Sequence, residues 1–320
     1  MIYKENKGQK FFTHPLGIIV AALAATFLWG SAFPFIKLSY QALDIGTKDY
    51  FEQILFAGYR FLLASIMIFM FLYGLKGTIR YQRGTAKRIV TVGLFQTFLQ
   101  YIFFYIGMSY CSGVQGSIIA GTTTFFQILI AHFVFNNDRL STRKVIGMLI
   151  GFTGVIIVNI THSSESAFTF MSIFGIGELL LLLAMASGGL GNVLVKKYSG
   201  EVDILYLTAY QMLFGAICLL VIGGSQVGFL PFTFGINTIG MLLYLAALSA
   251  GGFVLWNYVM KYNPVGKVSM YLFFIPIFGV ILSALLLRET LHLSVLTSLA
   301  LVVIGILVVN KQTHVFGKND

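Results

Sequence analysis

Three charged side chains stand in or beside long apolar runs, where a charge is hard to accommodate. Arg60 and Glu178 lie inside two of these runs, and Lys37 lies close to the end of another. At membrane depth each charge costs on the order of 3 kcal/mol, so such a side chain usually faces a cavity or a partner instead of lipid. Glu178 could therefore take up a proton or bind a cation. It could also form a structural salt bridge with Arg60 or Lys37, which is the interpretation we favour.

Amide and aromatic side chains in the apolar runs could orient a small ligand. Gln96 and Gln100 are four residues apart, as are Tyr101 and Tyr105, so each pair shares one face of a helix. Apolar walls with a few polar groups are typical of small-molecule pockets. These side chains could instead form an interfacial aromatic belt or join helices by hydrogen bonds. The candidate pocket residues are Trp29, Gln96, Gln100, Tyr101, Tyr105, Asn192, Trp256, Asn257 and Tyr271.

Motifs for catalysis, metal binding or nucleotide binding are absent from the sequence. It contains no HExxH, GxSxG or GxxxxGK[ST] pattern, and His132 in an apolar run has no second His or Cys at metal-ligand spacing. We therefore expect no catalytic residue, no metal and no cofactor. Cys111 and Cys218 are expected to be free thiols, although a bridge between them stays open.

These side chains must be positioned by a set of apolar helices. The sequence contains ten apolar runs, each about as long as the 17 to 25 residues that cross roughly 30 Å of hydrocarbon. The predicted fold is therefore all-α and integral to a membrane. In chain order, the ten predicted spans are 16–40, 53–75, 89–109, 114–135, 145–161, 172–195, 204–223, 238–260, 268–287 and 291–310.

The charges alternate from one gap between the runs to the next. Seventeen of the 21 lysines and arginines fall in every second gap or in the two tails. Basic short loops stay in the cytoplasm, so both termini are predicted to be cytoplasmic, in a multi-pass cell-membrane protein. Only 10% of the residues are charged, against about 25% in a soluble domain. Anionic lipid headgroups, and not nucleic acid, are the expected partners of the scattered basic residues.

The two halves of the chain resemble each other at a nearly constant offset. At an offset of 151, Leu140 overlays Leu291, Gly154 overlays Gly305 and Asn159 overlays Asn310. We predict two five-helix repeats, 16–161 and 172–310, joined by a linker at 162–171 and flanked by tails at 1–15 and 311–320. An odd number of helices per repeat inverts one copy relative to the other, and such inverted repeats place a binding site at the midplane.

Two prolines fall inside predicted spans and are candidate hinges. Pro34 lies in the first span and Pro276 in the ninth, and a proline inside a helix kinks it. The fourth span has no proline at the place that corresponds to Pro276. A hinge there is therefore expected in only one half.

An ordered set of short motifs extends over residues 16 to 310. The set comprises Trp29-Gly30-Ser31-Ala32-Phe33-Pro34, Arg60-Phe61-Leu62-Leu63-Ala64, Asp138-Arg139-Leu140 with Gly147 and Gly154, Gly177-Glu178-Leu179-Leu180, Leu255-Trp256, and Pro276 with Glu289-Thr290-Leu291 and Gly305. It resembles the drug/metabolite transporter superfamily, and in particular its ten-helix EamA-type metabolite exporters. The resemblance implies that spans one, three, four, six, eight and nine surround a central cavity, with spans five and ten at the periphery.

The resemblance and the repeat together predict a secondary transporter that works by alternating access. Export of small polar metabolites, with amino acids or related compounds as expected substrates, is the function that we favour. An uptake permease for nucleosides, sugars or cofactors is one alternative. An intramembrane enzyme acting on lipid-linked substrates is the other, and paired acids at membrane depth would be needed for it. Proton coupling and the choice between monomer and homodimer stay open.

Overall fold

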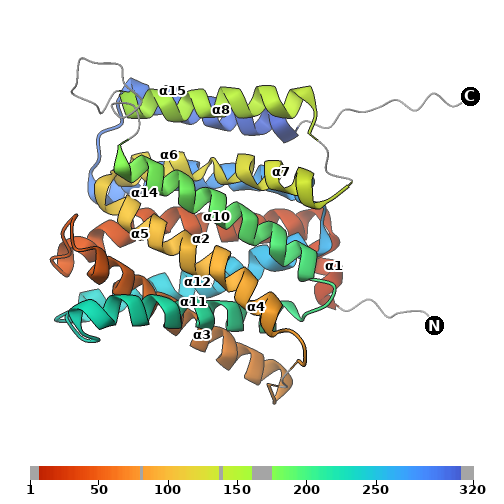
Figure 1. The fold of residues 1–320 in the computed structure, drawn as a ribbon. Coiled ribbons are helices and arrows are strands. Elements are labelled where there is room, and N and C mark those ends of the chain that lie inside the picture. Colours follow the sequence, from red (N-terminus) through yellow and green to blue (C-terminus); the bar gives the residue numbers. More distant parts are fainter. Residues whose placement is uncertain (1–6, 80–81, 137–139, 161–174, 311–320) are drawn as a thin grey trace, which may run out of the picture.

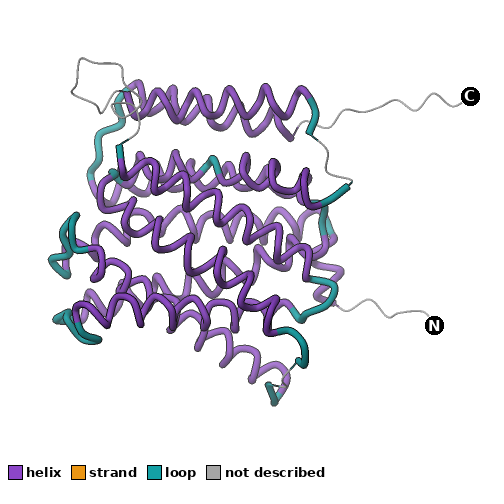
Figure 2. The backbone as a smooth tube through the Cα atoms, in the orientation of Figure 1, coloured by secondary structure: helices purple, strands orange, loops and turns teal. Residues whose placement is uncertain are grey.

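The chain is an all-helical bundle in the part of it that the structure describes. A computed structural model describes residues 7–79, 82–136, 140–160 and 175–310. Figure 2 shows helices joined by short loops and no strand over these residues. The predicted all-α fold is therefore confirmed.

Helices begin and end close to the edges of the predicted spans. A short helix, α1 (Lys7–Thr13), precedes the first of them. The first half then contains α2 (Pro15–Ala42), α3 (Tyr50–Lys76), α4 (Ala86–Gly93), the π-helical segment η1 (Leu94–Leu99), α5 (Gln100–Tyr110), α6 (Gly113–Ala120), α7 (Thr123–Val134) and α8 (Thr142–Ile160). The second half contains α10 (Ile176–Tyr198), α11 (Ile204–Val227), α12 (Ile236–Tyr262), α13 (Val265–Val268), the 3-10 segment η2 (Ser269–Phe273), α14 (Phe274–Leu287) and α15 (Leu293–Asn310).

Most of these helical segments have the length and hydropathy of a membrane span. Within the described ranges, eight segments are long and apolar enough to cross a membrane, and Leu293–Val309 of α15 is a shorter apolar helix. Helix α8 spans 19 residues and packs along α15. The chain is thus a multi-pass membrane protein, while the exact number of ten spans stays a prediction.

The helices are stacked in layers. In Figure 1, α8 and α15 form a pair at the top, and α3 and α11 pack together near the bottom. Between them, α2 packs against α12 and α14, and α10 packs against α5, α6 and α7. The peripheral position of α8 and α15 agrees with what the resemblance implied for spans five and ten. The central helices are the ones that surround the candidate site.

One central span in each half leaves the α-helical conformation partway for a turn or a 3-10 segment, and the third span also contains the π-helical segment η1. The fourth span breaks between α6 and α7 at Gly121 and Thr122, and the ninth changes from α13 through η2 to α14. The breaks face each other, since a Cβ added at Gly121 would lie 3.3 Å from the Pro276 ring. Both halves thus contain a helix break, although only the second has a proline beside it, and the assignment of a hinge to either break stays a prediction. Pro34 lies inside α2, which continues past it, and Pro276 is the third residue of α14.

Both cysteines are free thiols, and Cys111 is buried in the loop between α5 and α6. Burial raises the pKa of the Cys111 thiol, which keeps it protonated and poorly nucleophilic at neutral pH. We expect Cys111 in a Cys218→Ser variant to react at least about tenfold more slowly with a maleimide in the folded protein than after unfolding in detergent. Mass spectrometry of the adduct measures this, and rapid modification of the folded protein would contradict the burial of Cys111.

Candidate functional site

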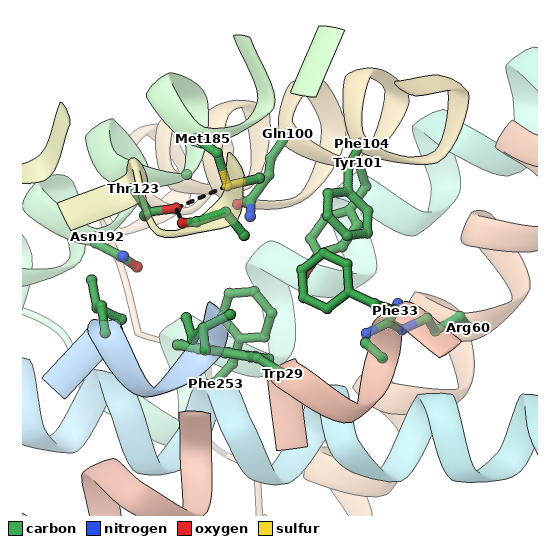
Figure 3. Close-up of a pocket in the computed structure, with 15 residues that line it drawn as sticks. Trp29, Phe33, Arg60, Gln100, Tyr101, Phe104, Thr123, Met185, Asn192 and Phe253 are labelled. Carbon is green, nitrogen blue, oxygen red and sulfur yellow. Dashed lines mark hydrogen bonds between the residues drawn. The ribbon is translucent and has the colours of Figure 1, made fainter. Parts of the chain in front are cut away.

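A cavity lies between the central helices and receives side chains from both halves of the chain. The empty space between its walls, including the part that is open to solvent, is about 590 Å³. Figure 3 shows its labelled side chains converging from α2, α3, α5, α7, α10 and α12. Five of the residues predicted from the sequence line it: Trp29, Arg60, Gln100, Tyr101 and Asn192. Helix α3 therefore belongs to the wall, beyond the helices that the resemblance implied.

Arg60 is the charged side chain of the wall, and it is almost completely buried at 1% exposure. Its Nε donates to the Ser249 hydroxyl at 2.7 Å and to the Leu245 carbonyl at 3.1 Å, and Nη1 donates to the Tyr105 hydroxyl at 3.1 Å. The guanidinium carbon lies 5.5 Å from the centre of the Tyr101 ring, within cation–π range. All these partners are neutral. The bonds fix the guanidinium in place without cancelling its charge.

The other two predicted charges lie outside the cavity wall and make separate contacts. The Glu178 carboxylate, in the first turn of α10, accepts a hydrogen bond from the Gln115 amide at 2.6 Å. Lys37 Nζ donates to the Met108 carbonyl at 2.9 Å. In the described part of the chain, Glu178 forms no ion pair with Arg60 or Lys37. The predicted salt bridge is therefore not formed in this structure, and Arg60 has no acidic partner among the described residues.

A chain of amide hydrogen bonds crosses the bundle at one end of the cavity. Asn192 accepts from the Gln96 amide at 2.8 Å and donates to the Gln127 carbonyl oxygen at 2.8 Å. Gln127 in turn donates to the Ser269 hydroxyl at 2.6 Å. Gln96 lies in η1, and π-helical turns of this kind occur often at functional sites. We call these four side chains the amide chain; it links η1 and α7 of the first half to α10 and η2 of the second.

Aromatic rings form the apolar part of the wall. The Trp29 ring packs edge-on against Phe253 with centroids 5.3 Å apart, and against Trp256 at 5.8 Å. Trp256 is fully buried behind Trp29 and does not line the cavity. Phe33 and Phe104 complete an aromatic surface beside Tyr101.

Two polar atoms of the wall have no hydrogen-bond partner among the described residues. These are Trp29 Nε1, a donor, and Gln100 Oε1, an acceptor. In Figure 3 the Gln100 side chain points into the cavity opposite Trp29. Buried polar groups are almost always bonded, so these two enclosed atoms are unsatisfied hydrogen-bonding groups of the wall.

The remaining predicted residues support the site or lie away from it. Tyr105 bonds Arg60 from behind the wall, and Gln96 belongs to the amide chain. Asn257 donates to Thr208 at 2.9 Å, deep between α12 and α11. Tyr271 is a half-exposed residue of η2 that does not line the cavity.

Sequence reasoning missed several wall residues. Polar character within an apolar run could have singled out Gln127 of the amide chain, but nothing distinguishes Phe33 or Phe104 in a chain with 31 phenylalanines. The wall residues that were not predicted include Phe33, Phe104, Ala120, Leu272 and Ile275.

Membrane-crossing helices from both halves of the chain surround a cavity with polar side chains, an arrangement typical of a membrane transporter. Comparison with known families agrees. The model of the EamA-like transporter family matches residues 16–160 and 175–311. The chain belongs to this family.

Similar proteins come from bacteria and archaea. The Bacillus subtilis protein named "Uncharacterized transporter YoaV" is 24% identical, over 90% of this chain and 95% of its own length. An Archaeoglobus fulgidus protein named "Uncharacterized transporter" is 26% identical, over 92% of this chain and 98% of its own. A crystal structure of another protein has the same fold, with a TM-score of 0.69 at 15% identity over 92% of this chain and 96% of the other.

Proposed function

We propose that this transporter exports small polar metabolites, with amino acids or related compounds as substrates, by alternating access between two inverted five-helix halves. The observation that carries the proposal is the cavity itself. Its wall is built by helices of both halves, and the amide chain joins the same two halves at one end of it. A site at such an interface opens to one side when the halves rock relative to each other.

The packing of the helices supports two equivalent halves. Helix α2 packs against α12 and α14, and α10, at the same place in the second half, packs against α5 and against α6 and α7. Three further contacts pair equivalent helices with each other: α3 with α11, α6 with α14, and α8 with α15. If the two halves are exchanged, this set of helix contacts therefore stays the same. Inverted repeats have this property when they enclose a shared site.

Counterflow in proteoliposomes tests the proposal. Vesicles containing the purified protein are loaded with an unlabelled amino-acid mixture, and uptake of labelled amino acids is followed with and without a pH gradient. Uptake that exceeds that of protein-free vesicles supports exchange through the protein, and its response to the gradient decides whether protons are coupled to it. A covalent change in the solutes during exchange would point to an enzyme instead.

Glu178→Gln is expected to keep exchange within about twofold of the unchanged protein. A glutamine at this position retains a carbonyl oxygen that can accept the Gln115 hydrogen bond, and Glu178 does not line the cavity. The initial rate of counterflow at each pH measures the effect. A loss of the response to the pH gradient in this variant would contradict the prediction and make Glu178 the coupling group.

A further inference from the structure

We propose that the cavity selects solutes that carry a carboxylate on an apolar body, with Arg60 as the receptor of the carboxylate. This inference rests on the proposed function, since it names the substrate class of the same site. Amines and quaternary ammonium ions are the classes that such a site rejects.

The guanidinium of Arg60 is a buried charge without a counter-ion. A buried cation is costly unless it is paired, and no acidic side chain pairs with Arg60 in the described ranges. The hydrogen bonds to Leu245, Ser249 and Tyr105 come from Nε and Nη1. Arginine has five N–H donors, so others remain for a ligand. A carboxylate matches such a planar donor set in charge and geometry.

Neighbouring side chains hold the guanidinium in a fixed orientation. Ser249 and Tyr105 bond it, while the Phe61 and Tyr101 rings lie 5.2 and 5.5 Å from its central carbon. A long side chain that is already immobilised loses little entropy when it binds. The arrangement therefore favours recognition by Arg60 over a role as a mobile counter-ion.

The rest of the wall fits an apolar body with a polar substituent. Trp29, Phe33 and Phe253 offer ring surfaces, and the polar side chains of the wall are those of Gln100, Thr123 and Asn192. The Gln100 oxygen can accept from an ammonium N–H once a rotation of its amide turns this enclosed atom toward the cavity, so a zwitterion also fits. A solute that carries only a positive charge does not fit, because the residues that line the cavity include no Asp or Glu to offset the charge of Arg60.

Tryptophan fluorescence can report binding in the cavity. The chain has two tryptophans, and Trp29 lines the cavity while Trp256 packs against it. Tryptophan fluorescence of the purified full chain in detergent can therefore be titrated with three probes of one skeleton: 4-methylpentanoate, 4-methylpentanamide and 4-methylpentylammonium. None of them absorbs where tryptophan does.

We expect the carboxylate to bind at least about tenfold more tightly than the amide, and the ammonium ion to bind more weakly than both. Arg60→Gln should remove the preference for the carboxylate over the amide. Arg60→Lys should keep part of it, because the charge stays while the planar donor set is lost. Lys37→Gln is the matched control: it removes a cation outside the wall and should leave the preference unchanged.

If Arg60→Gln does not fold, the comparison of the three probes on the unchanged protein still tests the proposal. Equal binding of carboxylate and amide, tighter binding of the ammonium ion, or an unchanged preference in a folded Arg60→Gln protein would each overturn the proposal. The counterflow assay distinguishes a failure of this proposal about Arg60 from a failure of the proposed function. Exchange of neutral or cationic solutes without exchange of carboxylates would refute the inference and leave the transporter intact. Selective carboxylate binding without any amino-acid exchange would refute amino-acid export and leave the receptor role of Arg60 standing.

Discussion

Asn192→Leu is expected to lower the rate of counterflow at least about tenfold and the free energy of unfolding by about 2 kcal/mol. Asn192 holds the middle of the amide chain, with Gln96 on one side and Gln127 on the other. Leucine leaves both amides without this partner, and a buried polar group without a hydrogen bond costs about 1–3 kcal/mol. It also places a branched apolar side chain on the wall of the cavity.

The effect on exchange follows from the position of the amide chain. It joins helices of both halves at one end of the cavity. Under the alternating access that we propose, breaking it should favour the conformation in which the halves separate at that end. Exchange needs both conformations to be populated, and a shift of about 1.4 kcal/mol changes their ratio tenfold.

Two measurements test this prediction. Counterflow gives the loss of exchange, and denaturation of the purified protein gives the loss of stability. Gln127→Leu is the second single variant of a double-mutant cycle. The double variant should lose less stability than the sum of the two single losses, because both side chains belong to one network. Strict additivity, or normal exchange by Asn192→Leu, would show that the amide chain does not act as a unit.

The positions of the helices could be predicted from the sequence because hydropathy and length are local properties. Arg60 and Asn192 could be found for a related reason: a polar side chain in an apolar run requires a partner or a cavity wherever it points. The interruption at Gly121 could not be found, because no proline marks it in the sequence. Local sequence therefore predicts which segments are helical better than where they break.

The roles of aromatic residues depend on the rotation of each helix about its axis, which local sequence does not fix. Trp29 and Trp256 were equivalent candidates, yet one lines the cavity and the other packs behind it. Tyr101 and Tyr105 share one helix face, yet Tyr101 is on the wall and Tyr105 supports Arg60. Arg60 was predicted to pair with an acid, and its actual partners come from α12 and α5, more than forty residues away in the chain. Such contacts are set by the packing of the whole bundle.

Gly305→Ala is expected to lower the free energy of unfolding by about 1–3 kcal/mol, because α8 and α15 touch through their backbones at this position. A Cβ at Gly305 would lie 2.5 Å from the Gly147 carbonyl oxygen and 2.6 Å from the Gly151 nitrogen. Neither atom belongs to a side chain that could turn away, so the two helices must separate. Gly147, on the other side of the contact, has the same restriction, since a Cβ there would lie 2.6 Å from the Gly305 carbonyl oxygen.

Gly240→Ala in α12 is the matched control, because a Cβ at Gly240 meets nothing within 4 Å. The same substitution should there be neutral or stabilise the helix by up to about 1 kcal/mol, the difference in helix propensity between alanine and glycine. Thermal denaturation of both variants in one detergent compares the two positions directly. Equal melting temperatures would mean that α8 and α15 do not approach as closely as the structure places them. If only Gly305→Ala melts early and still exchanges amino acids at low temperature, this contact stabilises the bundle without taking part in transport.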